Sequence, residues 1–428
     1  MRFASVPERT NVSSWSLTVV VIVMTLLASP TAFAQTEIDM VWWVSDADVE
    51  GKRNEVAIIE LFEEAHPDIK VNLIYVDWNM FPDQTLAWAA VGDLPDVLWI
   101  REDSLYDLAT RGLLMDLGPY IARDPDFDPN NFLPGVLESA RVNGVQVALH
   151  RDVWAPTVFF NRTWFQEYGL ADPESGWTYV DLLDTARKLT DPTKFKFGMG
   201  NIDSNRNAVI LSYGGSLMNT DQTEFTLTDL AVIEATTYMR SYRWEYHAEA
   251  QPGELADWWE PQWVRGDVAM QFWGPWAWPN YKETVTFDWD VAPPMAGPAG
   301  TYTFLDGLLL GVSSQTKNAE AAWKLVRFLG YDSRAQTEQV RRGMASPTVR
   351  YPETLAAFYE SENAPGSIQN YIAVLQSGRA GIPRLPREVS EIVNQAFTSI
   401  MNDEQSVTSA LGDAQVRATV ALRDVRNR

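Results

Sequence analysis

Three tryptophans, Trp273, Trp276 and Trp278, fall within the stretch QFWGPWAWP. Flat indole rings gathered in this way offer a stacking surface to a bound molecule. Gly274 and Pro275 interrupt any regular element here, which is typical of a turn whose side chains face a cleft. The stretch therefore predicts an aromatic binding surface, with the remaining indoles anchoring the turn.

Catalytic patterns are scarce. The three histidines, His66, His150 and His247, show no metal-ligating spacing, and neither a GxSxG elbow nor a phosphate-cradling GxxxxGK[ST] loop occurs. A glycoside hydrolase needs only two suitably spaced carboxylates, which 57 acidic residues easily supply. We expect a protein without metal or cofactor, and glycoside hydrolysis stays open as a remote alternative.

Composition limits the partners. The chain has 428 residues, which is long for one domain, so two domains are expected. Hydrophobic residues make up 46% of it, which indicates a packed globular protein. A formal net charge of −23 argues against nucleic acid and anionic membranes, since both attract a basic surface. Cysteine is absent, which excludes disulfides, thiolate metal sites and a lipid-modified cysteine anchor.

Residues 1–34 differ from the rest of the chain. Arg2 and Arg9 precede an apolar run from Leu17 to Leu27, which is too short for the roughly twenty residues of a membrane span. Small residues end the segment at Ala34, as at a signal-peptidase site. We expect a signal peptide cleaved near Ala34 and a mature protein that diffuses in a periplasm.

The mature chain alternates between strand and helix patterns. Apolar runs predict strands at 38–45, 69–78, 94–101 and 195–201, and helical periodicity lies between them, for example at 54–67 and 179–191. Such alternation indicates an α/β fold with parallel strands, whose ligands sit beyond the carboxyl ends of the strands. Two segments rich in Pro and Gly, around Pro156 and at 297–303, suit passages between domains.

The order of these motifs resembles the sugar-binding branch of the extracellular solute-binding proteins of ABC importers. The resemblance runs from Ile38 to Phe328, and GDVAMQFWGPWAW is its most specific piece. It implies a two-lobed periplasmic binding protein fold of type II, with discontinuous lobes, a hinge and a central cleft. The expected lobes are 35–153 with 296–346, and 154–295 with 347–428.

The resemblance also implies a function. Members of the branch capture a carbohydrate, either a mono- or an oligosaccharide, by hinge closure and deliver it to a membrane permease, without catalysis. Sugars present C–H faces to aromatic rings and hydroxyl groups to planar polar side chains. We expect such a ligand here, a permease as partner and a monomeric protein.

Site candidates follow from the motif and from the predicted strand ends. Trp276 matches the stacking tryptophan of the branch, and Trp154 stands where the maltose-binding members have a carboxylate. Asp103 matches a carboxylate contact, whereas Ile100 and Ser104 replace a tryptophan and an arginine. The further candidates are Trp273, Asp152, Trp43, Ser45, Asp46, Asp77, Trp78, Arg101, Asn205 and Asp306. Trp278 is expected in the core.

The charge of the ligand stays open at this level. An anionic solute such as a uronate or a glycerol phosphate needs a cationic partner in the cleft, because a desolvated charge must be paired. Five arginines are available for that role: Arg101, Arg151, Arg206, Arg341 and Arg342. Abundant Trp and Asp favour a neutral sugar instead.

Overall fold

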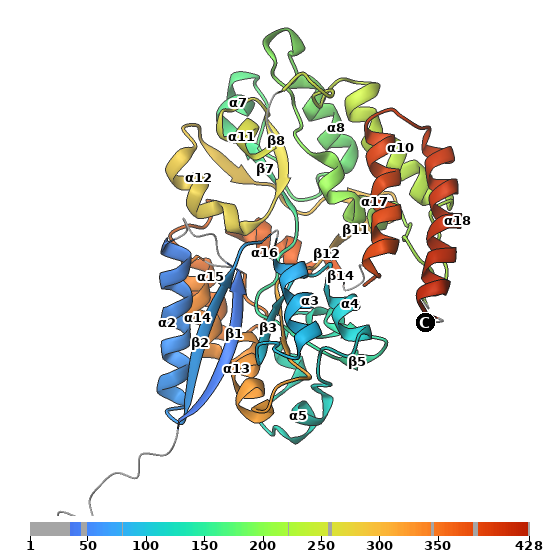
Figure 1. Cartoon of the computed structure of the whole chain (residues 1–428). Coiled ribbons are helices and arrows are strands. Elements are labelled where there is room, and N and C mark those ends of the chain that lie inside the picture. The colour runs from blue at the N-terminus through green and yellow to red at the C-terminus, as the bar shows by residue number, and fades with distance from the viewer. Residues whose placement is uncertain are drawn as a thin grey trace, which may run out of the picture.

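The computed structural model describes residues 35–43, 49–78, 80–220, 222–255, 259–343, 346–379 and 384–426. The expected signal peptide, residues 1–34, lies outside these ranges, as do Ser45 and Asp46. The described chain forms two lobes, one above the other in Figure 1. Across the described residues, no helix combines the length and the apolarity that a bilayer span requires.

The first lobe contains a five-stranded sheet. Its strand order is β2-β1-β3-β13-β6, formed by Ile69–Val76, Thr36–Trp43, Val97–Ile100, Leu309–Val312 and Leu149–His150. Strand β1 pairs in parallel with β2 and β3, whereas β13 is antiparallel to both β3 and β6. The predicted parallel α/β arrangement is therefore confirmed for the first three strands. Their carboxyl ends point toward the second lobe (Figure 1).

Helices cover this sheet because their apolar faces are buried against it. In α13, for example, Leu325, Val326, Phe328 and Leu329 are all buried, and the ring of Phe328 lies 5.5 Å from that of Phe62 in α2. The helices of this lobe are α2 (Val49–Ala65), α3 (Phe81–Val91), α4 (Leu105–Thr110), α5 (Gly118–Arg123), α6 (Val136–Ser139), α13 (Ala319–Tyr331), α14 (Ser333–Arg341) and α15 (Pro352–Tyr359). A hairpin of β4 (Arg141–Val142) and β5 (Val145–Gln146) lies beside α4.

The second lobe is built on a three-stranded antiparallel sheet, in the order β8-β7-β9. These strands are Met270–Trp273, Thr157–Asn161 and Trp289–Val291, and β7 is buried along its whole length. Its helices are α7 (Arg162–Glu167), α8 (Tyr179–Lys188), α9 (Arg206–Ser212), α10 (Leu230–Trp244), α11 (Trp259–Val264), α12 (Trp278–Thr284), α17 (Arg387–Met401) and α18 (Val407–Arg426). Helices α17 and α18 pack against α10, on the right in Figure 1.

The strand expected at 195–201 is not formed. Phe197 and Met199 instead make isolated bridges to Val268 and Glu249. Gly198 approaches the backbone of α8 so closely that a Cβ atom there would lie 1.9 Å from the carbonyl oxygen of Ala186. This close packing holds the segment in an irregular extended conformation, without the continuous hydrogen-bond ladder of a β-strand.

The chain passes between the lobes at a narrow waist. One passage leads from β6 to β7, and a second leads from β10 (Ala296–Gly297) and β11 (Gly300–Thr301) through β12 (Thr303–Phe304) to β13. The two passages are bonded to each other, because Trp154 and Asp306 exchange backbone hydrogen bonds of 2.7 and 3.0 Å. Strand β14 (Gly378–Arg379) pairs with β12 at the same level.

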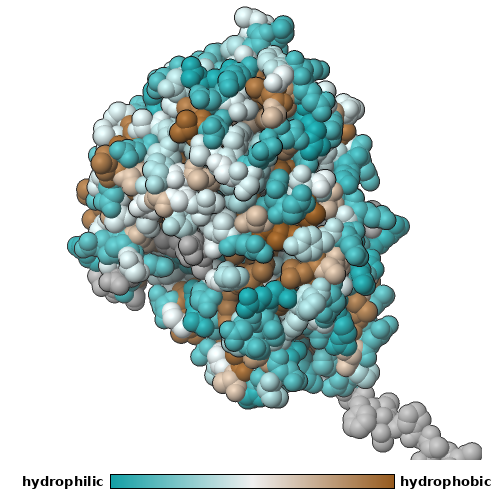
Figure 2. All heavy atoms as spheres, turned by 180° about the vertical axis from the view of Figure 1, so that it is seen from behind, coloured by the Kyte–Doolittle hydropathy of each residue, from teal (hydrophilic) through white to brown (hydrophobic). Residues whose placement is uncertain are grey.

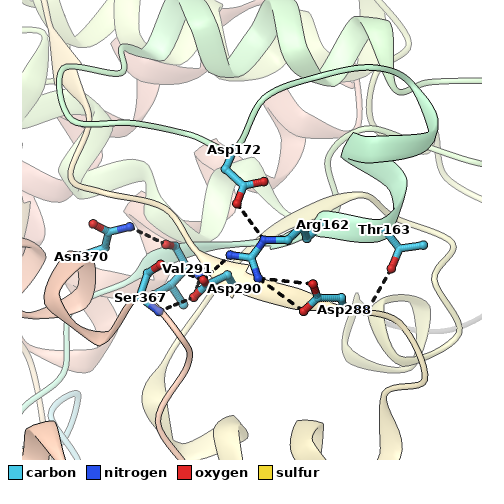
Figure 3. Close-up of polar contacts among 8 residues, drawn as sticks. All are labelled: Arg162, Thr163, Asp172, Asp288, Asp290, Val291, Ser367 and Asn370. Carbon is cyan, nitrogen blue, oxygen red and sulfur yellow. Dashed lines mark hydrogen bonds and ion pairs between the residues drawn. The ribbon is translucent and has the colours of Figure 1, made fainter.

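A polar network fixes the start of α16 (Ile368–Gln376) to the second lobe (Figure 3). The buried carboxylate of Asp290 on β9 accepts hydrogen bonds from Ser367 N at 2.9 Å and Ser367 Oγ at 2.7 Å. The guanidinium of Arg162 donates to Oδ2 of the same carboxylate, the oxygen that also accepts from Ser367 Oγ. One carboxylate thus joins β9, α7 and α16, and gives the waist a rigid connection on the side of the second lobe.

Hydrophilic side chains cover most of the face seen from behind in Figure 2, with hydrophobic residues in small groups between them. Such a surface agrees with the solvated acidic exterior that the net charge of −23 predicts.

Candidate functional site between the lobes

Aromatic rings gather where the parallel strands of the first lobe end. Trp43 is the last residue of β1, and Trp78 follows β2 by two positions. Their rings meet edge to face with centroids 5.3 Å apart, and Trp99 of β3 lies 5.4 Å from Trp78. Trp43 and Trp78 are half-buried, so part of each indole stays accessible. The neighbouring Asp77 is exposed.

A charged group follows β3 directly. The guanidinium of Arg101 lies 4.6 Å from the ring centre of Trp78 and donates two hydrogen bonds to the carboxylate of Asp103, at 2.5 and 3.2 Å. Ser104 Oγ donates to the same carboxylate at 3.0 Å. The Asp103 side chain remains 53% exposed, so it can still accept a hydrogen bond from a ligand hydroxyl.

The second lobe contributes the tryptophans of the QFWGPWAWP stretch. Trp273 ends β8, and Trp276 lies in a short 3-10 turn, where 43% of it is exposed. The indole of Trp276 folds back over Gly274, since a Cβ atom at Gly274 would lie 1.9 Å from its ring. Trp278, in contrast, is buried against Phe358 and Tyr371, in agreement with the core position expected for it.

Trp154 at the waist connects to this aromatic group. Its ring lies 5.1 Å from Trp276 and 5.6 Å from Phe304, edge to face in both cases. Trp273 meets Trp276 at 5.2 Å. Trp154 is therefore brought from a distant part of the sequence to Trp273 and Trp276, and the three predicted site residues form one aromatic surface with Trp276 as its most exposed member.

Asp306 belongs to a buried ion pair that sequence reasoning missed. Arg384, three residues before the start of α17, donates to Asp306 Oδ1 at 2.9 Å and Oδ2 at 3.4 Å. The same guanidinium donates to the backbone oxygens of Glu102 and Ser139. Arg384 thereby joins the end of β3, the end of α6 and the second passage of the waist. The sequence does contain a signal for Arg384, because this residue lies between two prolines in the stretch IPRLP. Like the segments around Pro156 and at 297–303, such a Pro-containing stretch is typical of a passage between domains.

Glu102 is the second group that was missed. Burial, with the neighbouring carboxylate of Asp306, raises the pKa of Glu102 to about 8. Its Oε2 atom is buried and makes no hydrogen bond to the described residues. A side chain of this kind, at the junction of the two lobes, carries its proton at neutral pH.

Two predicted residues lie apart from these groups. Asp152 is 5% exposed and forms an ion pair of 2.9 Å with Arg151, while Leu308 N donates to it at 3.1 Å. Asn205 is buried in the second lobe, where its amide nitrogen lies 3.5 Å from Tyr179 OH. Asn205 Oδ1 is buried and makes no hydrogen bond to the described residues. A ligand role for Asp152 and Asn205 stays a prediction.

A cavity of about 310 Å³ opens between the lobes next to Arg101 and Asp103. Its first wall consists of the start of α3 and the junction of β3 with α4, and its second wall is α17. From α17 it receives polar side chains that the sequence had not indicated: Arg387, Ser390, Glu391 and Asn394. Cavities of roughly 300 to 1,000 Å³ hold small-molecule ligands, so the volume suits a compact polar solute.

The arginines near this region already have partners. Arg101 is bonded to Asp103, Arg384 to Asp306, and Arg387 to Glu391 at 2.9 Å. Arg206 donates to Asn394, and Arg342, which does not line this cavity, pairs with Glu338. An anionic ligand would have to compete with these carboxylates, whereas hydroxyl groups can add to the same network.

The chain is similar in sequence to known solute-binding proteins. A family model of bacterial extracellular solute-binding proteins matches residues 47–331. A putative binding protein from Brucella abortus (strain 2308) is 24% identical over 376 residues, which cover 85% of this chain and 88% of that protein.

Solved structures share the fold. An ABC substrate-binding protein from Listeria monocytogenes in complex with cycloalternan superimposes with a TM-score of 0.80 at 24% identity, covering 90% of this chain and 99% of that one. A solute-binding protein from Thermotoga lettingae TMO, bound with α-D-tagatose, gives a TM-score of 0.74 at 17% identity and covers 91% and 100%. The expected α/β fold with two discontinuous lobes is confirmed by these likenesses.

Proposed function

Because the chain belongs to the bacterial extracellular solute-binding proteins, we propose that it is the periplasmic receptor of an ABC importer and that it captures a carbohydrate between its lobes. The proposal is supported by two observations: an accessible aromatic surface on the second lobe, led by Trp276, and a group of planar polar side chains at the strand ends of the first lobe, led by Asp103. Aromatic faces with convergent hydroxyl partners are the chemistry that sugar recognition requires.

The mechanism is hinge closure. A sugar docks on one lobe, the other lobe closes over it, and water leaves the cleft. The ligand shifts the balance toward the closed form only through contacts that the open form lacks, so both lobes must contribute. Trp276 on the second lobe and Arg101 with Asp103 on the first lobe satisfy this condition.

Delivery to a permease and export into the periplasm are part of the proposal. The predicted cleavage near Ala34 yields a mature protein from Gln35. We propose the lobe boundaries predicted from the sequence, except that α15 (Pro352–Tyr359) packs against α14 and so belongs to the first lobe. We propose that the receptor acts as a monomer and leaves its ligand chemically unchanged. Tagatose and cycloalternan, which the two structural neighbours hold, make neutral sugars the first ligands to test.

Thermal unfolding tests the proposal. The protein from Gln35 onward is unfolded, stripped of solute and refolded, then heated with neutral sugars, uronates and glycerol phosphates in turn. A ligand at a hundred times its dissociation constant stabilises the folded state by about 2.7 kcal/mol. Stabilisation by a neutral sugar that is recovered intact is the expected result. Stabilisation by anionic solutes alone, or hydrolysis of a glycoside, would contradict it.

A further inference from the structure

Arg384 is joined by its side chain to one lobe and by its chain neighbour to the other. Its guanidinium donates to Asp306 and to the backbone oxygens of Glu102 and Ser139, at distances between 2.9 and 3.4 Å. All three partners lie in the first lobe or at the waist. The next residue, Leu385, packs against the hydrophobic core of the second lobe. Two consecutive side chains are therefore held by different lobes.

The start of α17 has a second contact with the first lobe. Pro386 precedes the helix, and no side chain at that position accepts a hydrogen bond from the first turn. The N–H group of Arg387 donates instead to the carboxylate of Asp107 on α4, at 3.3 Å. The N–H groups at a helix start need acceptors, and the helix dipole favours a carboxylate there. The first lobe thus fixes the beginning of a helix whose body packs on α10 and α18 of the second lobe.

The same guanidinium also acts on the aromatic surface, through Asp306. The backbone of Asp306 exchanges two hydrogen bonds with that of Trp154. At the next position, a Cβ atom on Gly307 would lie 2.0 Å from the carbonyl oxygen of Asp152, so the two passages are packed too closely to slide past each other. A group that holds Asp306 therefore also holds Trp154, whose ring contacts Trp276 of the second lobe.

A small movement at the start of α17 becomes larger along the helix. Asn394 lines the cavity beside Asp103 and lies about 10 Å along the axis from the start of α17, because an α-helix rises about 1.5 Å per residue. A tilt of about 10° at the start therefore moves this position by about 2 Å. A displacement of that size is enough to make or break a hydrogen bond.

We propose that Arg384 is a positioning residue for solute capture: it is the pivot about which the lobes close, and it holds Trp154 against Trp276 in the arrangement that binds the ligand. This role rests on the proposed function and requires no contact between Arg384 and the ligand. A guanidinium suits it, because its planar fork bonds several groups at once, whereas a lysine ammonium concentrates its charge at one point.

The variant Arg384→Lys tests the pivot. It keeps a positive charge beside Asp306, so the protein should fold, but it cannot hold the carboxylate and both backbone oxygens together. Arg243→Lys is the matched control, because Arg243 donates to Glu249 Oε1 at 2.7 Å and to the backbone oxygen of Met401 at 3.0 Å, all within the second lobe. Both variants lose hydrogen bonds of the same kind, so a role in stability alone would affect the two proteins alike.

Calorimetric titration with the neutral sugar that most stabilises the wild-type protein gives the first comparison. We expect the dissociation constant to rise at least fivefold in Arg384→Lys and to change by less than twofold in Arg243→Lys. Wild-type affinity in Arg384→Lys, or the same rise in both variants, would overturn the inference and leave the proposed function intact. Absence of sugar binding by the wild-type protein would overturn the proposed function, and the role of Arg384 in capture with it.

The distance between the lobes gives the second comparison, and its measurement needs no ligand. The chain contains no cysteine, so Val91→Cys on α3 and Val180→Cys on α8 allow one spin label on each lobe. Both side chains are exposed. Double electron–electron resonance should give a broader distribution of label distances when Arg384→Lys is added, and the original distribution when Arg243→Lys is added. An unchanged distribution with Arg384→Lys would overturn the inference, even where sugar binding is weaker.

Discussion

The indole rings of Trp154 and Trp276 meet edge to face, with centroids 5.1 Å apart and an interplanar angle of 85°. Trp154 lies on the passage that leaves the first lobe, and Trp276 lies on a turn of the second lobe. Trp154 lies at the waist and touches Trp276, a candidate for ligand contact. A movement of the passage that carries Trp154 would therefore shift the aromatic surface. The hinge and the binding surface are thus physically adjacent.

Truncation of two tryptophans in one stretch should lower the free energy of unfolding by very different amounts. Trp278→Ala removes an indole that is 3% exposed and leaves a cavity beside Tyr371, so it should lower the free energy of unfolding by about 3 to 5 kcal/mol. Trp276→Ala removes a side chain that is 43% exposed and should cost only about 1 kcal/mol. Urea unfolding of both variants measures the difference. Equal losses would contradict the assignment of one indole to the core and the other to the surface.

Gly274 should act on binding through Trp276. In Gly274→Ala the new methyl group meets the indole ring, which must move away. We expect a loss of sugar affinity as large as in Trp276→Ala, because the stacking surface is displaced rather than removed. Gly412→Ala in α18 is the control, since a Cβ atom there has nothing within 4 Å. Wild-type affinity in Gly274→Ala would show that the ring position is unimportant.

The ion pair between Arg384 and Asp306 should contribute strongly to stability. Both side chains are nearly buried, at 10% and 6% exposure, so Arg384→Met leaves a carboxylate without its cation. The expected loss is about 3 to 5 kcal/mol. Arg123→Met breaks an exposed pair with Glu320 and should cost about 1 kcal/mol or less. Denaturant midpoints of the two variants compare the losses, and similar values would contradict the buried character of the waist pair.

Glu102 should make the protein less stable as the pH rises. Its folded-state pKa is raised to about 8, above the ordinary value of 4.5, chiefly by burial. Between these values the unfolded chain has released the proton that the folded chain retains, so the free energy of unfolding from this group falls with rising pH. Glu102→Gln removes this fall, and its stability relative to wild type should grow between about pH 5 and pH 8.

Unfolding curves at several pH values between 5 and 8.5 test this expectation. The exposed Glu167→Gln serves as the control and should follow the wild-type profile. If the profiles of Glu102→Gln and wild type run parallel across this range, the buried and protonated state of Glu102 is wrong.

Much of the fold was predictable because its signals are local. Apolar runs at β1, β2 and β3 alternate with amphipathic helices, and this pattern alone indicates a parallel sheet. The segment 195–201 was assigned to a strand by the same rule, which failed there. Its conformation depends on the contact of Gly198 with α8, and no local pattern encodes a contact of that kind.

The site was predictable only in part. Trp276, Trp154 and Asp103 stand at motif positions or strand ends, where sequence reasoning looks for ligand contacts. The polar face of α17 lies nearly three hundred residues beyond Asp103 and meets it only through the relative placement of the lobes. Arg384 was overlooked for the same reason, although the prolines on both sides of it mark a passage.

The most direct test of sugar capture is a calorimetric titration of the stripped protein, from Gln35 onward, with the neutral sugar that stabilises it most. We expect saturable binding of one ligand per chain, and at least tenfold weaker binding by Trp276→Ala in a protein that remains folded. Saturable binding with the same constant in Trp276→Ala would remove the aromatic surface from the site. A folded protein that binds no neutral sugar would contradict the proposal that this chain captures a carbohydrate between its lobes.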